Sequence, residues 1–357
     1  MTKKIFLSCL FLNLSILSVW SQKVQEPKEP YPYISEDVTY TNKTDNIVLS
    51  GTLTFPKNPK KVPVVILISG SGPQDRNSEL MGHKPFLVLA DNLTKKGIAV
   101  LRIDDRGTGK SQGVYNESSL NDFKKDTEFA IEYLKTRKEI DPKKIGLIGH
   151  SLGGVIASII AANSNEASFI ILLAGTGLRG DKLMLLQKEI IERKMGIGEE
   201  GIAVGQKNIG GAYDIILKST SDKNKLEADL EKYFSEVFGA ALPANQLKIL
   251  SKQLTLPWLA DFIKFDPATS LVNVRCPLLA LNGSNDTQVP AKENLTAIKE
   301  YVQKSGNKHV TVMEIPNLNH LFQESETGLP QEYASIQETF SLTAMNIISD
   351  WIIQITM

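Results

Sequence analysis

The sequence predicts an α/β fold, in which helices cover both faces of a mostly parallel sheet and an α-helical insertion interrupts the alternation. Short apolar runs of strand length alternate with segments of helical spacing, a pattern typical of parallel sheets buried on both faces. The alternation stops between residues 175 and 274, where only helical spacing is found. A pentapeptide, Gly149-His150-Ser151-Leu152-Gly153, joins an apolar run to a segment rich in small residues, as a sharp strand-to-helix turn requires.

The composition is that of an ordinary globular protein and argues against nucleic acid as a partner. The chain has 357 residues, of which 42% are hydrophobic and 22% charged, so it has ample material for a core. Basic and acidic residues number 40 each, and the absence of a net basic field excludes the usual electrostatic basis of nucleic-acid binding.

The first residues resemble a secretory signal. Two lysines near the start precede an uncharged apolar stretch over residues 5–19, and Val19 and Ser21 have the small size required at the −3 and −1 positions. We therefore predict a signal peptide over residues 1–21, cleaved after Ser21, and a secreted or periplasmic location. An uncleaved N-terminal anchor is the alternative, because the apolar stretch is long for a signal. No later run has the length of a membrane span.

The rest of the chain divides into a core and an insertion. Residues 22–36, rich in Pro, Glu and Lys, are expected to be a mobile linker. Residues 37–174 and 275–357 are expected to form the α/β core, and residues 175–274 a helical cap folded over the carboxyl edge of the sheet.

The individual elements follow from periodicity and turn residues. Strands are expected at Val38–Tyr40, Ile47–Phe55, Val62–Ile68, Ile98–Ile103, Lys144–Ile148, Phe169–Leu173, Leu278–Leu281 and Val310–Ile315, the first two forming an antiparallel pair. Core helices are expected at Phe86–Lys96, Leu120–Thr136 with Ser119 as its N-cap, Val155–Ala162, Ala291–Val302 and Ser335–Ile353. Insertion helices are expected at Lys182–Met195, Ile202–Leu217, Leu226–Phe238 and Ala244–Leu254.

The pentapeptide around Ser151 has the G-x-S-x-G pattern of a nucleophile elbow. Such a turn holds the serine at a strained backbone angle, and glycines on either side keep neighbouring chains from clashing with it. The hydroxyl then stands at the N-terminus of the following helix, where free N–H groups gather. We expect Ser151 to be a nucleophile.

A serine nucleophile needs a base, and His320 is the histidine best placed to supply one. It lies in the loop after the last predicted strand, where catalytic side chains of parallel sheets gather. His83 lies in an earlier loop, His309 begins a strand and is expected to be exposed, and His150 is expected to point away from the Ser151 hydroxyl.

The base in turn needs a carboxylate, and Asp286 is the single acid in the loop after the preceding strand. The chain order Ser151, Asp286, His320 is the order expected to accompany this elbow. The alternative role for Asp286 is that of a turn or helix N-cap residue.

An attacked carbonyl oxygen needs two hydrogen-bond donors. We assign these to the backbone N–H of Leu152, at the start of the helix, and that of Ser71, in the glycine-rich loop after Val62–Ile68. The N–H of Gly72 is the fallback, and an ordinary tight turn is the alternative for this loop.

Two other features have simpler interpretations. Gly109-Lys110-Ser111 resembles the end of a phosphate-binding loop, but Asp104 stands where that motif requires glycine, so nucleotide binding is not expected. Asp105-Arg106-Gly107 is expected to brace the edge of the active site. Cys276, the one cysteine left after signal cleavage, is expected to be buried and inert.

Aromatic residues near the end of the insertion are candidates for a substrate pocket. We assign this role to Trp258, Phe262 and Phe265, together with Phe322 beside the catalytic histidine. Packing within the core of the cap is the alternative for the three insertion residues.

Several motifs together resemble the α/β-hydrolase superfamily and, within it, bacterial serine esterases of the EstD-like type. The similar segments are Gly70-Ser71-Gly72-Pro73-Gln74-Asp75-Arg76-Asn77, Asp105-Arg106-Gly107-Thr108-Gly109-Lys110-Ser111, Pro257-Trp258, Phe265-Asp266-Pro267 and Asn319-His320-Leu321-Phe322-Gln323. Asn77 departs from the pattern, because an acid is common after the arginine. The resemblance implies the α/β-hydrolase fold and hydrolysis of a small carboxylic ester with no cofactor and no metal.

These observations lead to a secreted or periplasmic serine carboxylesterase acting on small to medium esters. An acyl-peptidase or thioesterase with the same three side chains is the first alternative. A non-catalytic binding protein on a hydrolase scaffold is the second. Acyl preference and oligomeric state are left open by the sequence.

Overall fold

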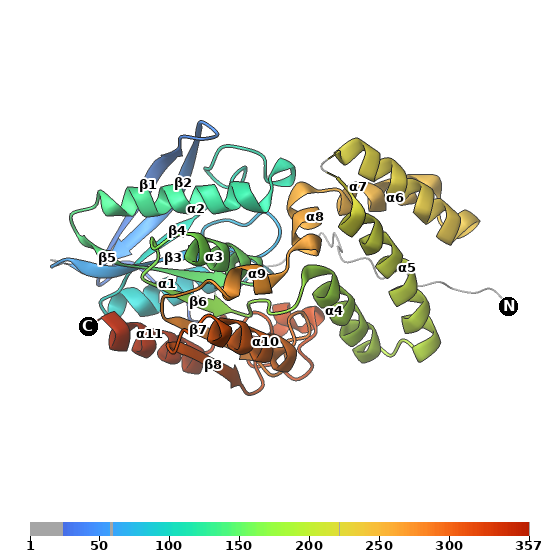
Figure 1. Cartoon of the computed structure of the whole chain (residues 1–357). Helices are drawn as coiled ribbons and strands as arrows, with labels where there is room; N and C mark the ends of the chain where they lie inside the picture. Colours follow the sequence, from blue (N-terminus) through green and yellow to red (C-terminus); the bar gives the residue numbers. More distant parts are fainter. Residues whose placement is uncertain (1–23, 58–59, 221, 357) are drawn as a thin grey trace.

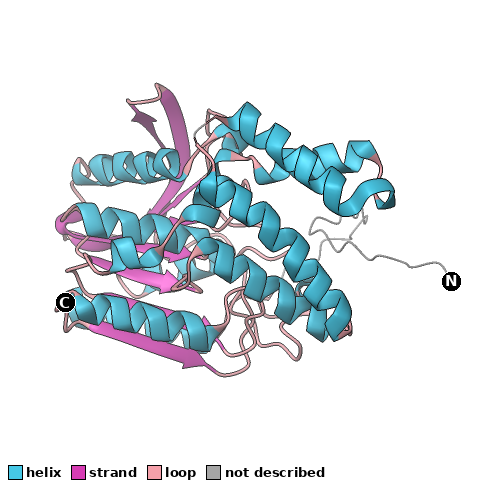
Figure 2. Cartoon of the chain, turned by 45° about the vertical axis from the view of Figure 1, so that its right-hand side comes forward, coloured by secondary structure: helices cyan, strands magenta, loops and turns pink. Residues whose placement is uncertain are grey.

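The computed structural model describes residues 24–57, 60–220 and 222–356, which form an eight-stranded sheet flanked by helices (Figures 1 and 2). The predicted signal peptide lies outside the described residues. Across the sheet the strands run in the order β1-β2-β4-β3-β5-β6-β7-β8. They are β1 (Ile34–Asn42), β2 (Ile47–Phe55), β3 (Val62–Ile68), β4 (Ala99–Ile103), β5 (Ile140–His150), β6 (Phe169–Leu173), β7 (Leu278–Gly283) and β8 (Val310–Ile315).

The sheet is parallel from β4 to β8, and β1 and β2 add an antiparallel edge. The chain passes from β3 to β4 on one side and then returns to place β5 on the other side of β3. Strand order therefore reverses at β3 and β5, and the loops that follow these two strands open a crevice at their carboxyl ends. This reversal fixes where a site can form.

Helices cover both faces of the sheet, as the alternation predicted. On one face α2 (Leu120–Lys135), α3 (Leu152–Asn163) and α10 (Ala291–Lys304) pack over side chains such as Val64 and Ile66. On the other face α1 (Pro85–Lys95) and α11 (Leu342–Thr356) pack over side chains such as Val65 and Leu67. The central strands β3, β6 and β7 are largely apolar because successive side chains enter two different cores.

Local signals set several helix ends correctly. Ser119 caps α2 by accepting from the N–H of Asp122, and the Asp122 carboxylate accepts in return from the N–H of Ser119. The last helix is an exception to the prediction. Residues Pro330–Ser335 form a short 3₁₀ turn, and α11 begins only at Leu342.

The predicted helical insertion lies between β6 and β7, and beyond one end of the sheet in Figure 1. It has its own small core around Tyr213, Leu230 and Phe234. Two of its helices were missing from the prediction, because each is short and begins with a proline at its first position, α8 at Pro257 and α9 at Pro267. The insertion comprises α4 (Gly180–Lys194), α5 (Glu199–Lys218), α6 (Lys223–Phe238), α7 (Ala244–Leu254), α8 (Pro257–Lys264) and α9 (Pro267–Leu271).

The expected linker makes specific contacts where the structure describes it, so a mobile linker over residues 22–36 is a wrong prediction for residues 24–36. The side chain of Gln25 bonds to the backbone of Thr339 and Phe340, at 2.6–3.0 Å. Glu26 pairs with Lys84 at 3.1 Å, and β1 already begins at Ile34. Local composition gave no sign of these partners, which lie far away in the sequence.

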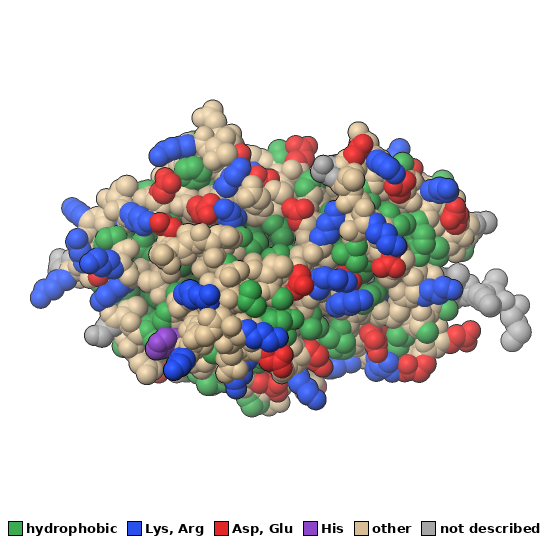
Figure 3. Space-filling model, viewed as in Figure 1, with side chains coloured by type: hydrophobic (Ala, Val, Ile, Leu, Met, Phe, Trp, Pro, Cys, Tyr) green, Lys and Arg blue, Asp and Glu red, His purple; other side chains and the backbone are tan. Residues whose placement is uncertain are grey.

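The surface agrees with the balanced composition. Basic and acidic side chains are interspersed over the face drawn in Figure 3, and neither sign dominates there. Within the described part of the chain, no helix combines the length and the apolar character that crossing a bilayer requires.

Candidate active site

Ser151 lies at the sharp turn between β5 and α3, with φ of 53° and ψ of −116°. Two glycines make this turn possible. A Cβ on Gly149 would lie 2.2 Å from the carbonyl oxygen of Gly153, and one on Gly153 would lie 2.2 Å from that of Ile68. The strained serine is fixed by its own N–H, which donates to the carbonyl of Leu173 on β6 at 2.9 Å.

His320 and Asp286 come from the loops after β8 and β7 and are both buried. The imidazole Nδ1 lies 2.8 Å from Oδ2 of Asp286. The other carboxylate oxygen accepts from the backbone N–H groups of Gln288 and Val289, each at 2.8 Å. With its orientation fixed on both sides, the carboxylate sets the tautomer of His320 with hydrogen on Nδ1, which leaves Nε2 as an acceptor.

The backbone of His320 is held as firmly as its ring. Its carbonyl accepts from Nε2 of His150 at 2.8 Å, and its N–H donates to the hydroxyl of Tyr333. Gln288 donates to the same hydroxyl at 3.0 Å. No local pattern predicts the roles of Tyr333 and Gln288, because these depend on contacts between separate loops.

His150 was expected to point away from the nucleophile, and the structure corrects this. Its ring lies against that of His320, with centroids 4.7 Å apart, and lines the same cavity as Ser151. Burial first, and repulsion by His320 second, lower the pKa of His150 to about 3. The ring is therefore neutral at physiological pH, with its hydrogen on Nε2.

A cavity of about 110 Å³ brings these groups together. Ser151, His320 and His150 line one part of it, and the loop after β3 contributes Ser71 and Gln74. Its remaining lining is mainly apolar, and none of the residues that line it is an acid or a lysine or arginine.

The two predicted oxyanion donors lie on either side of the elbow. Leu152 is the first residue of α3, so its N–H has no acceptor within the helix. Gly70 packs directly on the elbow, since a Cβ there would lie 3.4 Å from that of Ser151, and Ser71 follows it into the cavity. The N–H of Gly72, the fallback donor, is taken by the hydroxyl of Tyr115.

The aromatic residues assigned to a pocket do not line this cavity, which corrects that prediction. Trp258 is 9% exposed and packs with Phe262 and Phe265 against the core formed by α2 and α3. Phe322 is fully buried and stacks on Phe340, with centroids 5.4 Å apart. Its partner Phe340 and its neighbour Leu321 contribute to the cavity wall instead.

The remaining histidines have structural positions. His83 is fully buried and bonds through its two nitrogens to the Thr339 hydroxyl and the Tyr333 carbonyl, at 3.0 and 2.9 Å. It thereby ties the loop after β3 to the segment that supports His320. His309 is exposed at the start of β8, as expected.

The loop around Lys110 does not resemble a phosphate site in the structure either. The carboxylate of Asp104 occupies its centre, accepting from the Lys110 N–H at 3.0 Å and from the Arg76 side chain at 2.7 Å. Such a carboxylate would repel a phosphate. Cys276 is half-buried, and burial raises the pKa of its thiol to about 11, as an inert cysteine requires. No group of three His, Cys, Asp or Glu residues within the described ranges is arranged to hold a metal ion.

The fold, with an elbow serine at the crevice where strand order reverses, places the chain in the α/β-hydrolase class. Over residues 84–326 the chain matches the Hydrolase_4 family, described as serine aminopeptidase, S33, and it belongs to this family.

Relatives confirm the resemblance inferred from the motifs. The chain is 26% identical over 306 residues to the esterase EstD of Thermotoga maritima, a match covering 85% of this chain and 64% of EstD. It therefore spans less than two thirds of that relative. An uncharacterized protein of Salmonella typhimurium, YfhR, is 30% identical over 135 residues, which are 36% of this chain and 42% of YfhR.

Solved structures show the same fold at low identity. The esterase Pf2001 of Pyrococcus furiosus superimposes with a TM-score of 0.51 and 18% identity, over 91% of this chain and 94% of its own. Est1E of Butyrivibrio proteoclasticus, solved with ferulic acid bound, superimposes with a TM-score of 0.51 and 18% identity. The match covers 89% of this chain and 98% of Est1E.

Proposed function

We propose that this protein is a serine carboxylesterase that hydrolyses small to medium carboxylic esters through Ser151, His320 and Asp286. The observation that carries the proposal is the 2.8 Å bond from Asp286 to the ring of His320, which lines the same cavity as the elbow serine. The EstD relative and the family match support hydrolytic chemistry.

In the proposed mechanism, Nε2 of His320 accepts the proton of the Ser151 hydroxyl as its oxygen attacks the ester carbonyl. Asp286 holds the ring in place and stabilises the imidazolium. The N–H groups of Leu152 and Ser71 bind the oxyanion. His320 then returns the proton to the departing alcohol, and water repeats the sequence on the acyl-enzyme to release the acid.

The cavity favours an esterase over the aminopeptidase activity that the family description names. An aminopeptidase needs an acidic group to bind the free amine of its substrate, and the cavity lining contains none. The His150 ring, which is neutral, does not attract a cation either. An aminopeptidase is thus the weaker proposal. An acyl-peptidase or thioesterase with the same three side chains remains the alternative, and comparing kcat/KM for short acyl esters, thioesters and amides distinguishes it from an esterase.

The cavity size favours short acyl groups. An apolar cavity of about 150 Å³ is large enough to hold benzene, and this one has about 110 Å³. We expect kcat/KM to be highest for acetyl to butyryl esters and to fall for longer chains on a graded panel of p-nitrophenyl esters. A maximum at eight carbons or more would contradict this assignment.

Replacing the nucleophile tests the proposal directly. Ser151→Ala should lower kcat for p-nitrophenyl acetate by roughly 10⁴-fold or more, because the covalent step is lost. A fluorophosphonate should label the wild-type protein at Ser151 and leave the variant unlabelled. Normal turnover by Ser151→Ala would overturn the assignment, and a wild-type protein without adduct or turnover would favour a binding protein.

We also propose export and a capping role for the insertion. Residues 1–21 are proposed as a cleaved signal, so the secreted or periplasmic protein should begin at Gln22, as N-terminal mass spectrometry can test. A mature protein that starts at Met1 would contradict cleavage. Residues 37–174 and 275–357 are proposed to form the core. Residues 175–274 are proposed to form a cap over the carboxyl edge of its sheet.

A further inference from the structure

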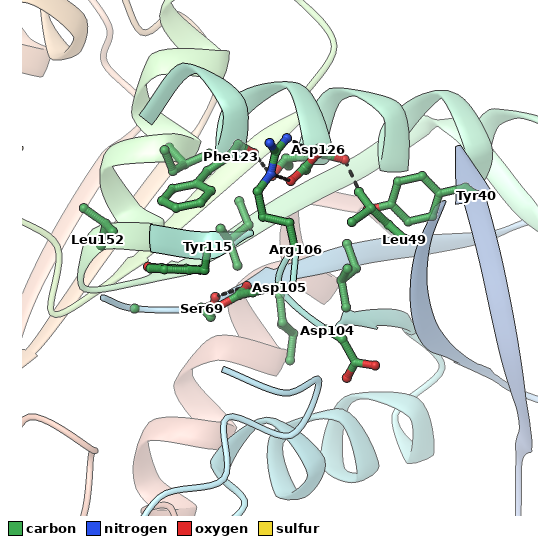
Figure 4. A pocket seen from close by; sticks show the side chains of 16 residues that line it. Tyr40, Leu49, Ser69, Asp104, Asp105, Arg106, Tyr115, Phe123, Asp126 and Leu152 are labelled. Atoms are coloured by element: carbon green, nitrogen blue, oxygen red, sulfur yellow. Dashed lines mark hydrogen bonds and ion pairs between the residues drawn. The ribbon is translucent and has the colours of Figure 1, made fainter. Parts of the chain in front are cut away.

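The loop that carries the proposed oxyanion donor Ser71 is backed by a second cavity rather than by packed side chains. This cavity has a volume of about 50 Å³ and lies between the loop after β3 and the segment after β4 (Figure 4). Ser69, Gly70, Asp105, Tyr115 and Leu152 are among the residues that line it. Because a void offers few van der Waals contacts, packing alone does not fix the loop.

Hydrogen bonds from Asp105 supply the missing restraint. One carboxylate oxygen accepts from the Ser69 hydroxyl at 2.6 Å, and the other accepts from the N–H of Gln74 at 2.9 Å. The N–H of Asp105 also donates to the carbonyl of Gln74 at 3.0 Å. These three bonds hold both ends of the segment Gly70–Pro73, which includes Ser71.

Asp105 directs its carboxylate to this loop because the neighbouring cation is engaged elsewhere. Arg106 turns away to Asp126 at 2.7 Å (Figure 4). It also pairs with Asp45 at 2.8 Å. Burial raises the pKa of Asp105 to about 7, only partly offset by the bonds from Ser69 and Gln74. A carboxyl kept here without a paired cation is costly, which indicates a role other than stability.

Tyr115 holds the middle of the same loop. Its hydroxyl accepts from the N–H of Gly72, the residue after Ser71. Its ring stacks on Phe123 of α2, with centroids 4.7 Å apart, and meets the edge of Trp258 of α8 at 6.0 Å. The loop is therefore attached through one side chain to both the core and the insertion.

We infer that Asp105 and Tyr115 are positioning residues for the proposed oxyanion hole, holding the loop from behind so that the Ser71 N–H faces the carbonyl attacked by Ser151. This inference rests on the proposed esterase function. Neither side chain touches substrate, so their removal should affect the transition state more than substrate binding.

The test compares variants at these positions with matched controls. Asp105→Ala should lower kcat for p-nitrophenyl acetate by about 10- to 100-fold with KM changed by less than about twofold, approaching the loss of one oxyanion donor. Asp105→Asn should restore most of the activity, because an amide accepts from the Gln74 N–H and donates to the Ser69 hydroxyl. Tyr115→Phe should lower kcat by about three- to tenfold, a smaller loss, because Tyr115 holds the loop through one hydrogen bond only.

Tyr40→Phe is the control for the cavity itself. Tyr40 lines the same void, but its hydroxyl donates to the carbonyl of Asp126 at 3.1 Å and does not contact the loop. This variant should retain wild-type kcat. Equal losses in Tyr40→Phe and Tyr115→Phe, or equal activity of Asp105→Ala and wild type, would overturn the inference while leaving the esterase proposal intact.

A readout independent of turnover separates this inference from the function on which it rests. Backbone amide hydrogen exchange at Ser71, Gly72 and Gln74 should accelerate by about tenfold or more in Asp105→Ala and stay unchanged in Tyr40→Phe. Inactive wild-type protein would refute the esterase proposal. Unchanged exchange in Asp105→Ala would refute the positioning role, whether or not the wild type is active.

Discussion

The neutral ring of His150 should make this protein sensitive to acid in a way that one substitution can remove. Burial lowers the pKa of His150 from its ordinary 6.5 to about 3. In the unfolded chain the ring gains a proton near pH 6.5, whereas in the folded protein it resists protonation. Its contribution to stability is therefore complete above pH 6.5 and is lost as the pH falls toward 3.

The size of the effect follows from the two pKa values. At 1.36 kcal/mol per pH unit, the difference between 6.5 and about 3 corresponds to on the order of 5 kcal/mol. This is an upper bound, because the ring is partly exposed in the cavity wall and is screened there. Between pH 6.5 and 4.5 we expect a loss of roughly 2–3 kcal/mol.

The substitution His150→Gln tests this contribution to stability. Glutamine gains no proton in this range, and its amide can donate to the His320 carbonyl as Nε2 of the histidine does. Free energies of unfolding from urea titrations at pH 7, 6, 5 and 4.5 should show the variant losing roughly 2–3 kcal/mol less than wild type. His309→Gln is the matched control, since His309 is exposed, and it should follow wild type.

A difference in unfolding free energy between wild type and variant that stays constant with pH would refute this reasoning. If wild type and His150→Gln stay parallel within about 0.5 kcal/mol from pH 7 to 4.5, the folded protein does not oppose protonation of His150. The low pKa and the neutral state assigned to the ring in the folded protein would then be wrong.

Three other substitutions have defined outcomes. Gly153→Ala brings a Cβ to 2.2 Å from the Ile68 carbonyl and should cost about 1–3 kcal/mol or more in thermal unfolding, with reduced turnover; wild-type stability would contradict the elbow packing. Tyr333→Phe leaves the His320 N–H without its acceptor and should cost about 1–3 kcal/mol in urea unfolding, with kcat lower than wild type; no change in either would show that the hydroxyl is dispensable. Asp286→Asn should lower kcat by about 10³- to 10⁴-fold at unchanged stability, as misorientation of the base predicts, and a loss under tenfold would remove Asp286 from the mechanism.

Much of the fold was predictable because its signals are local. Apolar runs, glycine-rich turns and the capping box of Ser119 each depend on a few neighbouring residues. The positions of Ser151, Asp286 and His320 could be assigned to one edge because parallel strands end together. The 2.8 Å contact between two loops separated by 34 residues is a consequence of that geometry.

What escaped prediction depends on contacts between distant segments. Trp258 and Phe322 were assigned to a pocket from their chemistry, yet an aromatic ring serves a core equally well, and periodicity cannot distinguish the two. Tyr333 and His150 support His320 through backbone groups, which leave no pattern in a sequence. The short helices that begin at Pro257 and Pro267 have too few residues to show a period.

The side-chain amide of Gln25 pairs with both the N–H and the carbonyl of Phe340, as a neighbouring strand would. Phe340 is also part of the cavity wall, 315 positions further along the chain. The contacts of Gln25 therefore support, from outside the cavity lining, a residue that forms part of its wall. Loss of the Gln25 side chain would therefore loosen this part of the cavity wall as well as lower stability.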